Sequence, residues 1–411
     1  MFSRLLIWPL RRTKRIEPPL WVIAMIAGLP LFSESMYTPA LPRIAASLAV
    51  EEALVEYTVS IYLICTALGV IFWGKISDLW GRRPCILWGF SLYMLGCFWC
   101  ASADSIYTLY VARVIQALGG SVGAVLAQAI SHDVFRGRRR GQVFSTIGVV
   151  LALAPAIAPG LGGLLVQQWG WRAIFIALAL SGVLAIVMLF LHLPETRAAD
   201  KRGLVNTFSL LRRMVRDPKV LTCGALVGIS NGIFMSYNAE GPFVMIDILK
   251  LSPVTYGLGF TLFAAFGALG SFTSKKLHNT METSQILKRG VQIKTMVTLF
   301  FAISMGALWS LQASPVVFVP LILVCMTLLA FGRGLDIANC LSLGLEDYAA
   351  QAGTATALMV CFYYIIIASS TAVMGWLHND TVLPMPLYMA GLALVAQGIS
   401  FFVPPSRHAN D

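Results

Sequence analysis

Two long apolar segments of the chain are separated by the polar stretch Gly74-Lys75-Ile76-Ser77-Asp78-Leu79-Trp80-Gly81-Arg82-Arg83-Pro84. Its glycines permit a tight turn, and Pro84 suits the first turn of a helix, where a backbone N–H donor is not needed. The flanking segments, residues 53–74 and 84–103, are each about 20 residues long, the length of a helix that crosses a bilayer. The stretch therefore predicts a charged loop between two membrane-spanning helices.

The composition of the whole chain points to the same class of protein. Of its 411 residues, 58% are hydrophobic and only 12% are charged, whereas soluble domains carry about 25% charged residues. A soluble fold of this size would lack the charge needed to solvate its surface. These values exclude a soluble globular domain, a disordered chain, a collagen, a coiled coil and a secreted disulfide scaffold, and they predict a polytopic membrane protein.

Apolar runs of this length recur along the chain. At about 20–25 residues per crossing plus short loops, a chain of 411 residues holds about 12 helices. The short segments of alternating polarity that indicate a membrane β-barrel are not found. We therefore predict an all-α membrane protein with twelve transmembrane helices. The expected spans are 20–46, 53–74, 84–103, 106–131, 141–168, 170–193, 220–247, 252–274, 286–311, 315–345, 350–377 and 383–403.

The basic residues indicate the orientation of these helices. Cytoplasmic loops carry an excess of Lys and Arg, and most of the 30 basic residues here fall in the even-numbered loops and the two tails. We therefore expect both termini in the cytoplasm and the chain in a bacterial inner membrane, as a multi-pass protein. The net charge of +11 largely follows from this asymmetry, so nucleic-acid binding is not predicted.

A charged segment, residues 194–219, divides the spans into two sets of six. Two such bundles around a central cavity form an architecture for alternating access. Within the segment, Leu204–Val215 mixes leucines with arginines, which predicts either an amphipathic helix on the inner leaflet or a solvated linker. The expected parts are a basic cytoplasmic tail 1–19, an N-terminal bundle 20–193, the linker 194–219, a C-terminal bundle 220–403 and a cytoplasmic tail 404–411.

Sequence signatures of enzymes and metal centres are lacking. Cys97 and Cys100 have CxxC spacing, but they lie in an apolar run without a partner motif of His or Cys, so structural packing is the better interpretation. The sequence has no H-E-x-x-H motif and no cofactor fingerprint after a predicted strand. We predict no metal, no cofactor and no enzymatic activity.

The loop quoted first resembles the cytoplasmic signature G-x-x-x-D-x-x-G-R-R/K of the major facilitator superfamily. The matching residues are Gly74, Asp78, Gly81, Arg82 and Arg83. The resemblance implies a fold of two pseudo-symmetric six-helix bundles, with charge contacts at this loop that hold the halves together in the outward-facing state. It also suggests Asp133, at the inner end of the fourth span, as a partner for the charges of this loop.

The fourth span resembles a second motif of the superfamily. Arg113 and Gln116 match an R-x-x-Q-G pattern that is tied to proton coupling, although Ala117 replaces its glycine. An arginine inside a membrane helix is costly and usually faces a partner or an aqueous cavity. The resemblance therefore implies a coupling role for Arg113.

The fifth span resembles the antiporter motif G-x-x-x-G-P-x-x-G-G of drug:proton antiporters, with Ala154 in place of its second glycine. The matching residues are Gly148, Pro155, Pro159, Gly160 and Gly163. Two prolines four residues apart also kink a helix, and glycines admit close neighbours. A kinked structural helix is therefore the alternative interpretation.

The first span is similar to a branch of these antiporters. Ser33–Pro42, with the sequence SESMYTPALP, looks like the D-M-Y-L-P-A-L-P segment of the bicyclomycin/chloramphenicol-resistance (Bcr/CflA-like) branch of the twelve-span drug:proton antiporters. The aspartate of that branch aligns with Ser35, and the acid here is Glu34, one position earlier. One residue corresponds to about 100° of rotation around a helix, so position alone does not give Glu34 the role of that aspartate.

Four acidic residues within or near the spans are candidate proton carriers: Glu34, Glu56, Glu240 and Asp336. Arg333 lies three residues before Asp336, a spacing that predicts a structural ion pair on one helix. We expect Glu34 and Glu240, one from each half, to face a shared cavity in which Arg113 biases protonation. Because Glu240 is an extra acid relative to the branch pattern, it favours cationic or amine-bearing substrates.

These patterns predict a proton-coupled antiporter that exports small organic compounds by alternating access. Tyr37 and Tyr237 are candidates for the apolar wall of its cavity, or for lipid-facing positions. The alternatives are an exporter of one native metabolite, such as a siderophore or an amino-acid derivative, and a proton-coupled nutrient importer. A receptor would have little use for intramembrane acids together with the loop signature. We expect a monomer in membrane lipid, with protons and a small-molecule substrate as its other partners, driven by the proton gradient without a cofactor.

Overall fold

The computed structural model describes residues 17–135, 137–197 and 207–404, and this part of the chain is helical without a β-strand. Most of the two expected tails and residues 198–206 of the expected linker lie outside the described residues. The first half contains α1 (Leu20–Met36), the 3-10 helix η1 (Thr38–Ala40), α2 (Leu41–Leu48), α3 (Glu52–Trp80), α4 (Arg82–Ala101), α5 (Ile106–Val134), α6 (Gly137–Trp169) and α7 (Arg172–His192). After α8 (Thr207–Met214), the second half contains α9 (Pro218–Pro242), the π-helix η3 (Phe243–Ile248), α10 (Pro253–Leu277), α11 (Thr283–Ser310), α12 (Pro315–Leu345), the 3-10 helix η4 (Glu346–Gln351), α13 (Ala352–Leu377) and α14 (Pro384–Ser400).

The long helices correspond to the expected spans. Within the described residues, 10 helices are long and apolar enough to cross a membrane by length and composition. Helix α6 occupies the fifth expected span, and α14, with 17 residues, occupies the twelfth. The prediction of an all-α membrane protein is confirmed.

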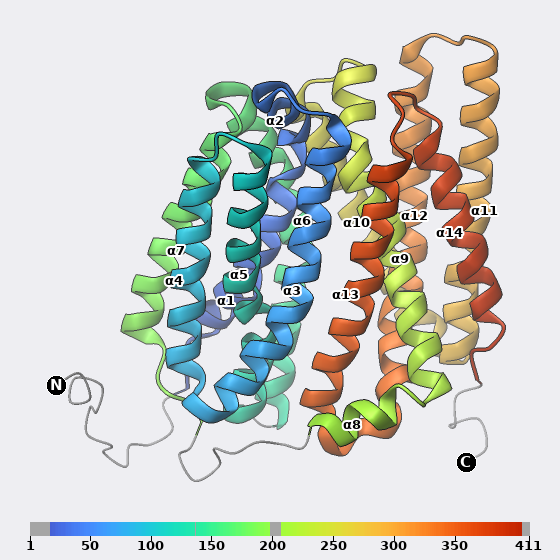
Figure 1. Ribbon diagram of the computed structural model, residues 1–411. Helices are drawn as coiled ribbons and strands as arrows, with labels where there is room; N and C mark the ends of the chain where they lie inside the picture. Colours follow the sequence, from blue (N-terminus) through green and yellow to red (C-terminus); the bar gives the residue numbers. More distant parts are fainter. Residues whose placement is uncertain (1–16, 136, 198–206, 405–411) are drawn as a thin grey trace.

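The helices form two groups that lie side by side (Figure 1). One cluster of buried apolar side chains comes almost wholly from residues before 194, and the other comes from residues after 207. The two groups meet where α6 packs against α10 and where α3 packs against α13. We call the end at which α1 begins and α14 ends the terminal end; α8 crosses this end (Figure 1).

The loop between α3 and α4 is shorter than the charged loop predicted from residues 74–84. Helix α3 continues through Gly74 and Asp78 to Trp80, and α4 begins at Arg82. Only Gly81 lies outside both helices, with a φ of 104° that favours glycine. The turn is therefore made by Gly81 alone, and Asp78 and Arg82 stand one helical turn apart across it.

The first expected span is also not one continuous helix. Residues 20–46 divide into α1, η1 and α2, and the break falls around Pro39 and Pro42. Proline lacks the N–H donor that a continuous helix needs. The break directs Tyr37, just after α1, into the interior, where it is fully buried.

Helix α8 corresponds to part of the predicted amphipathic segment, and Leu204–Asn206 lie outside the described residues. Its Leu210 and Met214 are buried in the apolar cluster of the second half, and Arg213 lies over the Tyr348 ring at 4.9 Å. Protein rather than lipid therefore covers this apolar face of α8.

Candidate coupling and transport site

Arg113 is the largest side chain buried completely in the described residues, with 1% of its surface exposed. Its guanidinium carbon lies 4.3 Å from the ring centre of Tyr37 and 4.1 Å from that of Tyr62, so two aromatic faces stabilise the cation. Nη1 donates to Oε1 of Gln116 at 2.7 Å, one turn along α5. Its Nε has no hydrogen-bond partner in the part of the chain that the structure describes. Arg113 is thus held in one place, with donor capacity left over.

Gln116 connects Arg113 to the first helix. Its amide nitrogen donates to the hydroxyl of Ser33 at 3.1 Å and lies 3.1 Å from the sulfur of Cys97. Ser33 immediately precedes Glu34, so the network ends next to the candidate acid. Cys97 is fully buried beside this amide.

Glu34 is nearly buried, with 9% of its surface exposed. The two cations that act on it electrostatically are Arg113 from its own half and Arg333 from the other half. Tyr363 and Tyr364 on α13 also interact electrostatically with Glu34. The carboxylate is therefore within electrostatic range of a cation from each half, although it lies one position away from the acid of the resembled branch.

The expected ion pair between Arg333 and Asp336 is not formed. Asp336 instead pairs with Lys294 of α11, and the side chains of both residues are at most 3% exposed. The Lys294 ammonium also donates to the hydroxyl of Ser230 on α9 at 2.6 Å. Arg333 donates to Asn231 at 2.7 Å and lies over the Phe234 ring. Sequence reasoning did not single out Lys294. The signal that could have found it was a cation inside the apolar part of the expected span 286–311, beyond Lys288 and Arg289 at its start.

Glu240 lies in a second buried cluster, at the end of the helices opposite to the terminal end. Both of its carboxylate oxygens lie within hydrogen-bond distance of Nδ1 of His378, at 3.1 and 3.0 Å. Glu56 of α3 joins them, with Oε1 3.6 Å from the same nitrogen. Nε2 of His378 faces Glu52 and Asp380, each at 3.1 Å. Sequence reasoning missed His378, which directly follows α13 and has no motif around it.

The carboxylates determine the charge of this imidazole. Burial acts to lower the pKa of His378, but its hydrogen bonds to Glu240 and Glu52 outweigh that effect and raise the pKa to about 11. His378 is therefore an imidazolium at neutral pH, surrounded by acids of both halves.

The structure does not bring Glu34 and Glu240 to one place. Tyr364, an electrostatic neighbour of Glu34, precedes His378 by 14 residues on α13, which is about 20 Å along a helix. His378 in turn contacts Glu240. The expected shared cavity of these two acids is thus not supported by their positions.

Neither candidate tyrosine lies on a lipid-facing surface. Tyr37 is fully buried, and its hydroxyl forms a hydrogen bond of 2.7 Å with Thr58. Tyr237 is also fully buried and packs against Tyr256, Phe260 and Phe263. Tyr237 therefore belongs to the aromatic core of the second half.

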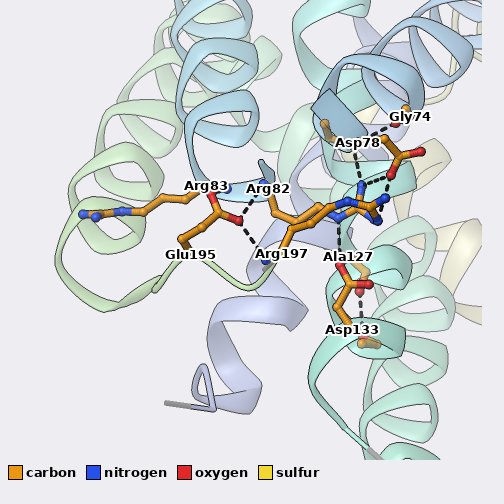
Figure 2. A network of polar contacts seen from close by, with 10 residues as sticks. Gly74, Asp78, Arg82, Arg83, Ala127, Asp133, Glu195 and Arg197 are labelled. Atoms are coloured by element: carbon orange, nitrogen blue, oxygen red, sulfur yellow. Dashed lines mark hydrogen bonds and ion pairs between the residues drawn. The ribbon is translucent and has the colours of Figure 1, made fainter. Parts of the chain in front are cut away.

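The charged motif of α3 and α4 forms a network at the terminal end (Figure 2). The Arg82 side chain contacts Asp78 at 3.1 Å, Asp133 at 2.9 Å and the Ser77 hydroxyl at 2.6 Å. The expected partnership of this loop with Asp133 thus exists through Arg82. Arg197, in the segment after α7, adds a second cation to Asp78 at 3.0 Å.

The second arginine of the motif has a different role. The Arg83 side chain points away from Asp78 (Figure 2) and donates to the carbonyl of Phe190 at 2.7 Å. Glu195 accepts from the backbone N–H groups of Arg82 and Arg83, at 2.9 and 3.3 Å. Within the described residues, each recorded partner in this network comes before residue 198. The network therefore joins helices of the first half to the start of the linker.

The glycines of the fifth span lie where the two halves touch. A Cβ atom on Gly163 would lie 2.3 Å from the carbonyl oxygen of Pro253, and one on Gly257 would lie 2.3 Å from that of Pro159. Thr261 of α10 donates to the carbonyl of Ala156 at 3.2 Å, and Pro155 also lies within this helix, as does Gly148. The motif therefore brings α6 and α10 into backbone contact, which fits both the antiporter interpretation and the structural one.

Two sets of long apolar helices, with charges paired inside them, define a multi-pass membrane protein of the transporter class. The chain belongs to the major facilitator superfamily, because the family model described as Major Facilitator Superfamily matches residues 23–371. The expected fold of two six-helix bundles is thereby confirmed. The structure of this chain is similar to the solved structure of a D-xylose–proton symporter, with a TM-score of 0.75. The two chains are 14% identical over 94% of this chain and 98% of that one.

Bacterial relatives extend over most of the chain. It is 29% identical to an uncharacterized transporter of Rickettsia felis, over 93% of this chain and 95% of the relative. It is 25% identical to a bicyclomycin resistance protein homolog of Haemophilus influenzae, over 94% and 96% of the two chains. The multidrug resistance protein MdtL of Escherichia coli is 28% identical over 79% and 80%. These relatives confirm the resemblance to the drug-resistance branch, and neither they nor the fold indicate an enzyme.

Proposed function

We propose that the protein is a proton-coupled antiporter that exports small organic compounds by alternating access. The relatives named for bicyclomycin and multidrug resistance support export of drug-like compounds. The observation that carries the proposal is the position of Glu34, which interacts with Arg113 of its own half and Arg333 of the other. A carboxylate placed between the halves can respond to their movement.

The chemistry of one carboxylate explains exchange rather than cotransport. Glu34 either holds a proton or stays ionised and attracts a cation, and it cannot do both at once. A cationic or amine-bearing substrate therefore competes with the proton for the same group, and competition of this kind couples outward movement of one to inward movement of the other. The preference for cations rests here on Glu34, because Glu240 is engaged with His378.

The basic residues indicate how the protein is oriented in the membrane. Arg82, Arg83 and Arg197 lie at the terminal end, and cytoplasmic loops carry such an excess. We therefore place the terminal end in the cytoplasm of a bacterial inner membrane and the cluster around His378 at the outer face. The protein then acts as a monomer with protons, substrate and lipid as its partners.

The test measures the pH gradient across inverted membrane vesicles that are energised acid-inside. An amine dye is added first and chloramphenicol second, to wild type, to Glu34→Gln and to Glu51→Gln, whose acid is exposed. We expect the amine dye to collapse the gradient in wild type and in Glu51→Gln but not in Glu34→Gln, and neutral chloramphenicol, which does not compete electrostatically for the carboxylate, to have a smaller effect.

Other outcomes select among the alternatives. If the gradient still collapses in Glu34→Gln, the protein is an antiporter whose coupling proton binds another acid. No response to either compound contradicts export of diverse drugs and favours a single native metabolite or nutrient import.

A further inference from the structure

The cluster around His378 has the donors of a metal centre. Nδ1 of His378 and one carboxylate oxygen each from Glu56 and Glu240 lie within 4.8 Å of one another. Glu56 comes from α3 in the first half, whereas Glu240 and His378 come from α9 and from the end of α13 in the second. Imidazole nitrogen with carboxylate oxygen is a donor set that suits divalent transition metals.

Glu56 lacks the partner that a buried carboxylate requires. It is fully buried, and neither of its oxygens has a hydrogen-bond partner among the described residues. Its Oε1 lies 3.6 Å from Nδ1 of His378, and its carboxyl group also interacts electrostatically with Glu240 and Glu52. Leaving an ionised carboxylate buried without hydrogen bonds is costly, so these oxygens have capacity for a further ligand.

A glycine allows this carboxylate to stand close to α13. A Cβ atom on Gly375 would lie 3.2 Å from Cβ of Glu56 and 3.3 Å from its Oε2. A larger residue at position 375 would crowd the side chain of Glu56. The close packing keeps Glu56 beside the ring of His378.

The other side of the imidazole carries the partners that a metal-bound histidine needs. Nε2 lies 3.1 Å from Glu52 and 3.1 Å from Asp380. A histidine that binds a metal through one nitrogen almost always donates its other N–H to a carboxylate or carbonyl, which fixes the tautomer. When Nδ1 loses its proton to a metal, this arrangement directs the Nδ1 lone pair toward Glu56 and Glu240.

We propose that His378, Glu56 and Glu240 bind a divalent transition-metal ion, with Zn²⁺ as the representative. With a neutral imidazole, the two ionised carboxylates carry two negative charges, which a dication balances. Binding of the metal through Nδ1 displaces any proton from that nitrogen.

The metal site would join the two halves of the transporter. Its ligands come from both halves, so a bound ion holds α3, α9 and α13 together at the end opposite to the terminal end. The ion would enter from solvent past Asp380 and Glu52, whose side chains are 87% and 29% exposed. Bound metal therefore favours the closed arrangement of this end.

The test titrates the purified full chain in detergent with CoCl₂ and follows the visible d–d absorption of bound Co²⁺. ZnCl₂ is then added in competition. The variants are His378→Gln and Glu56→Gln, and the matched controls are His192→Gln and His278→Gln at the ends of other helices. Gel filtration and thermal unfolding without metal check that each variant is folded.

We expect one Co²⁺ per chain in wild type and in both controls, displaced by Zn²⁺. Each of the two ligand variants should lower the affinity by more than about tenfold, the least that loss of even an outer partner costs. Absence of a d–d band, which would leave the cluster as a proton-holding ion pair only, overturns the proposal. So does binding that is unchanged in both ligand variants. The assay needs neither substrate nor gradient, so its failure is independent of the transport proposal.

Discussion

Lys294 and Asp336 pair inside the second half of the protein, and their side chains are 3% and 1% exposed. The hydroxyl of Ser230 completes the group from a third helix. Removing one member of a buried ion pair leaves an uncompensated charge, whereas replacing both with apolar residues is often neutral. The pair therefore constrains which substitutions this core accepts.

We predict that Lys294→Met lowers the free energy of unfolding by about 3–5 kcal/mol, because Asp336 is then buried without its cation. The double variant Lys294→Met/Asp336→Leu should recover most of this loss. Thermal unfolding of the purified proteins in detergent measures both. A single variant as stable as wild type would show that Asp336 does not depend on Lys294.

A second prediction concerns the contact between α4 and α5. A Cβ atom on Gly119 would lie 2.2 Å from the backbone nitrogen of Tyr93 and 2.7 Å from the carbonyl oxygen of Gly89. Backbone atoms cannot rotate away, so Gly119→Ala should destabilise the protein by about 1–3 kcal/mol. The same unfolding assay measures this loss.

Gly306→Ala is the matched control for that substitution. No atom lies within 4 Å of a Cβ at this position of α11 in the described structure. Alanine in a helix interior is favoured over glycine by about 0.5–1 kcal/mol, so Gly306→Ala should be neutral or stabilising. Equal losses at both positions would indicate that crowding between α4 and α5 is not the cause.

Much of the fold was predictable because span length and basic-loop asymmetry are local properties of the sequence. The contact of Arg82 with Asp133 was likewise predictable from a motif. The pairing of His378 with Glu240 was not, because the two residues are 138 positions apart. Helices that are apolar on all sides give no periodicity from which to infer the face that each residue occupies.

The same limit explains the error at Asp336. Spacing of three residues on one helix suggested Arg333 as its partner. Helix α11 packs against α12 and brings Lys294 to Asp336 instead, whereas Arg333 donates to Asn231. Only the tertiary packing of three helices decides between the two cations.

A third prediction addresses the network at the terminal end. Arg82 contacts Asp78, Asp133 and Ser77 at once, and a lysine cannot reproduce the fork of a guanidinium. Arg82→Lys should therefore lower the free energy of unfolding by about 1.5–3 kcal/mol, the value of hydrogen bonds to charged groups. Arg83→Lys, which loses one exposed bond to a carbonyl, should cost about 1 kcal/mol or less. Equal costs in thermal unfolding would argue against a special role for the fork of Arg82.

The last prediction concerns Arg113 and rests on the proposed antiport. A lysine at this position keeps the positive charge but cannot stack between Tyr37 and Tyr62 while it reaches Gln116. Arg113→Lys should therefore displace the cation from Glu34 and slow the substrate-triggered collapse of the pH gradient by about tenfold or more, since about 1.4 kcal/mol corresponds to tenfold. Arg172→Lys is the control, because Arg172 also lies over an aromatic ring, that of Trp171, but its side chain is 40% exposed. If Arg113→Lys and Arg172→Lys exchange protons at the wild-type rate, charge alone suffices near Glu34, and the aromatic pair around Arg113 serves packing rather than coupling.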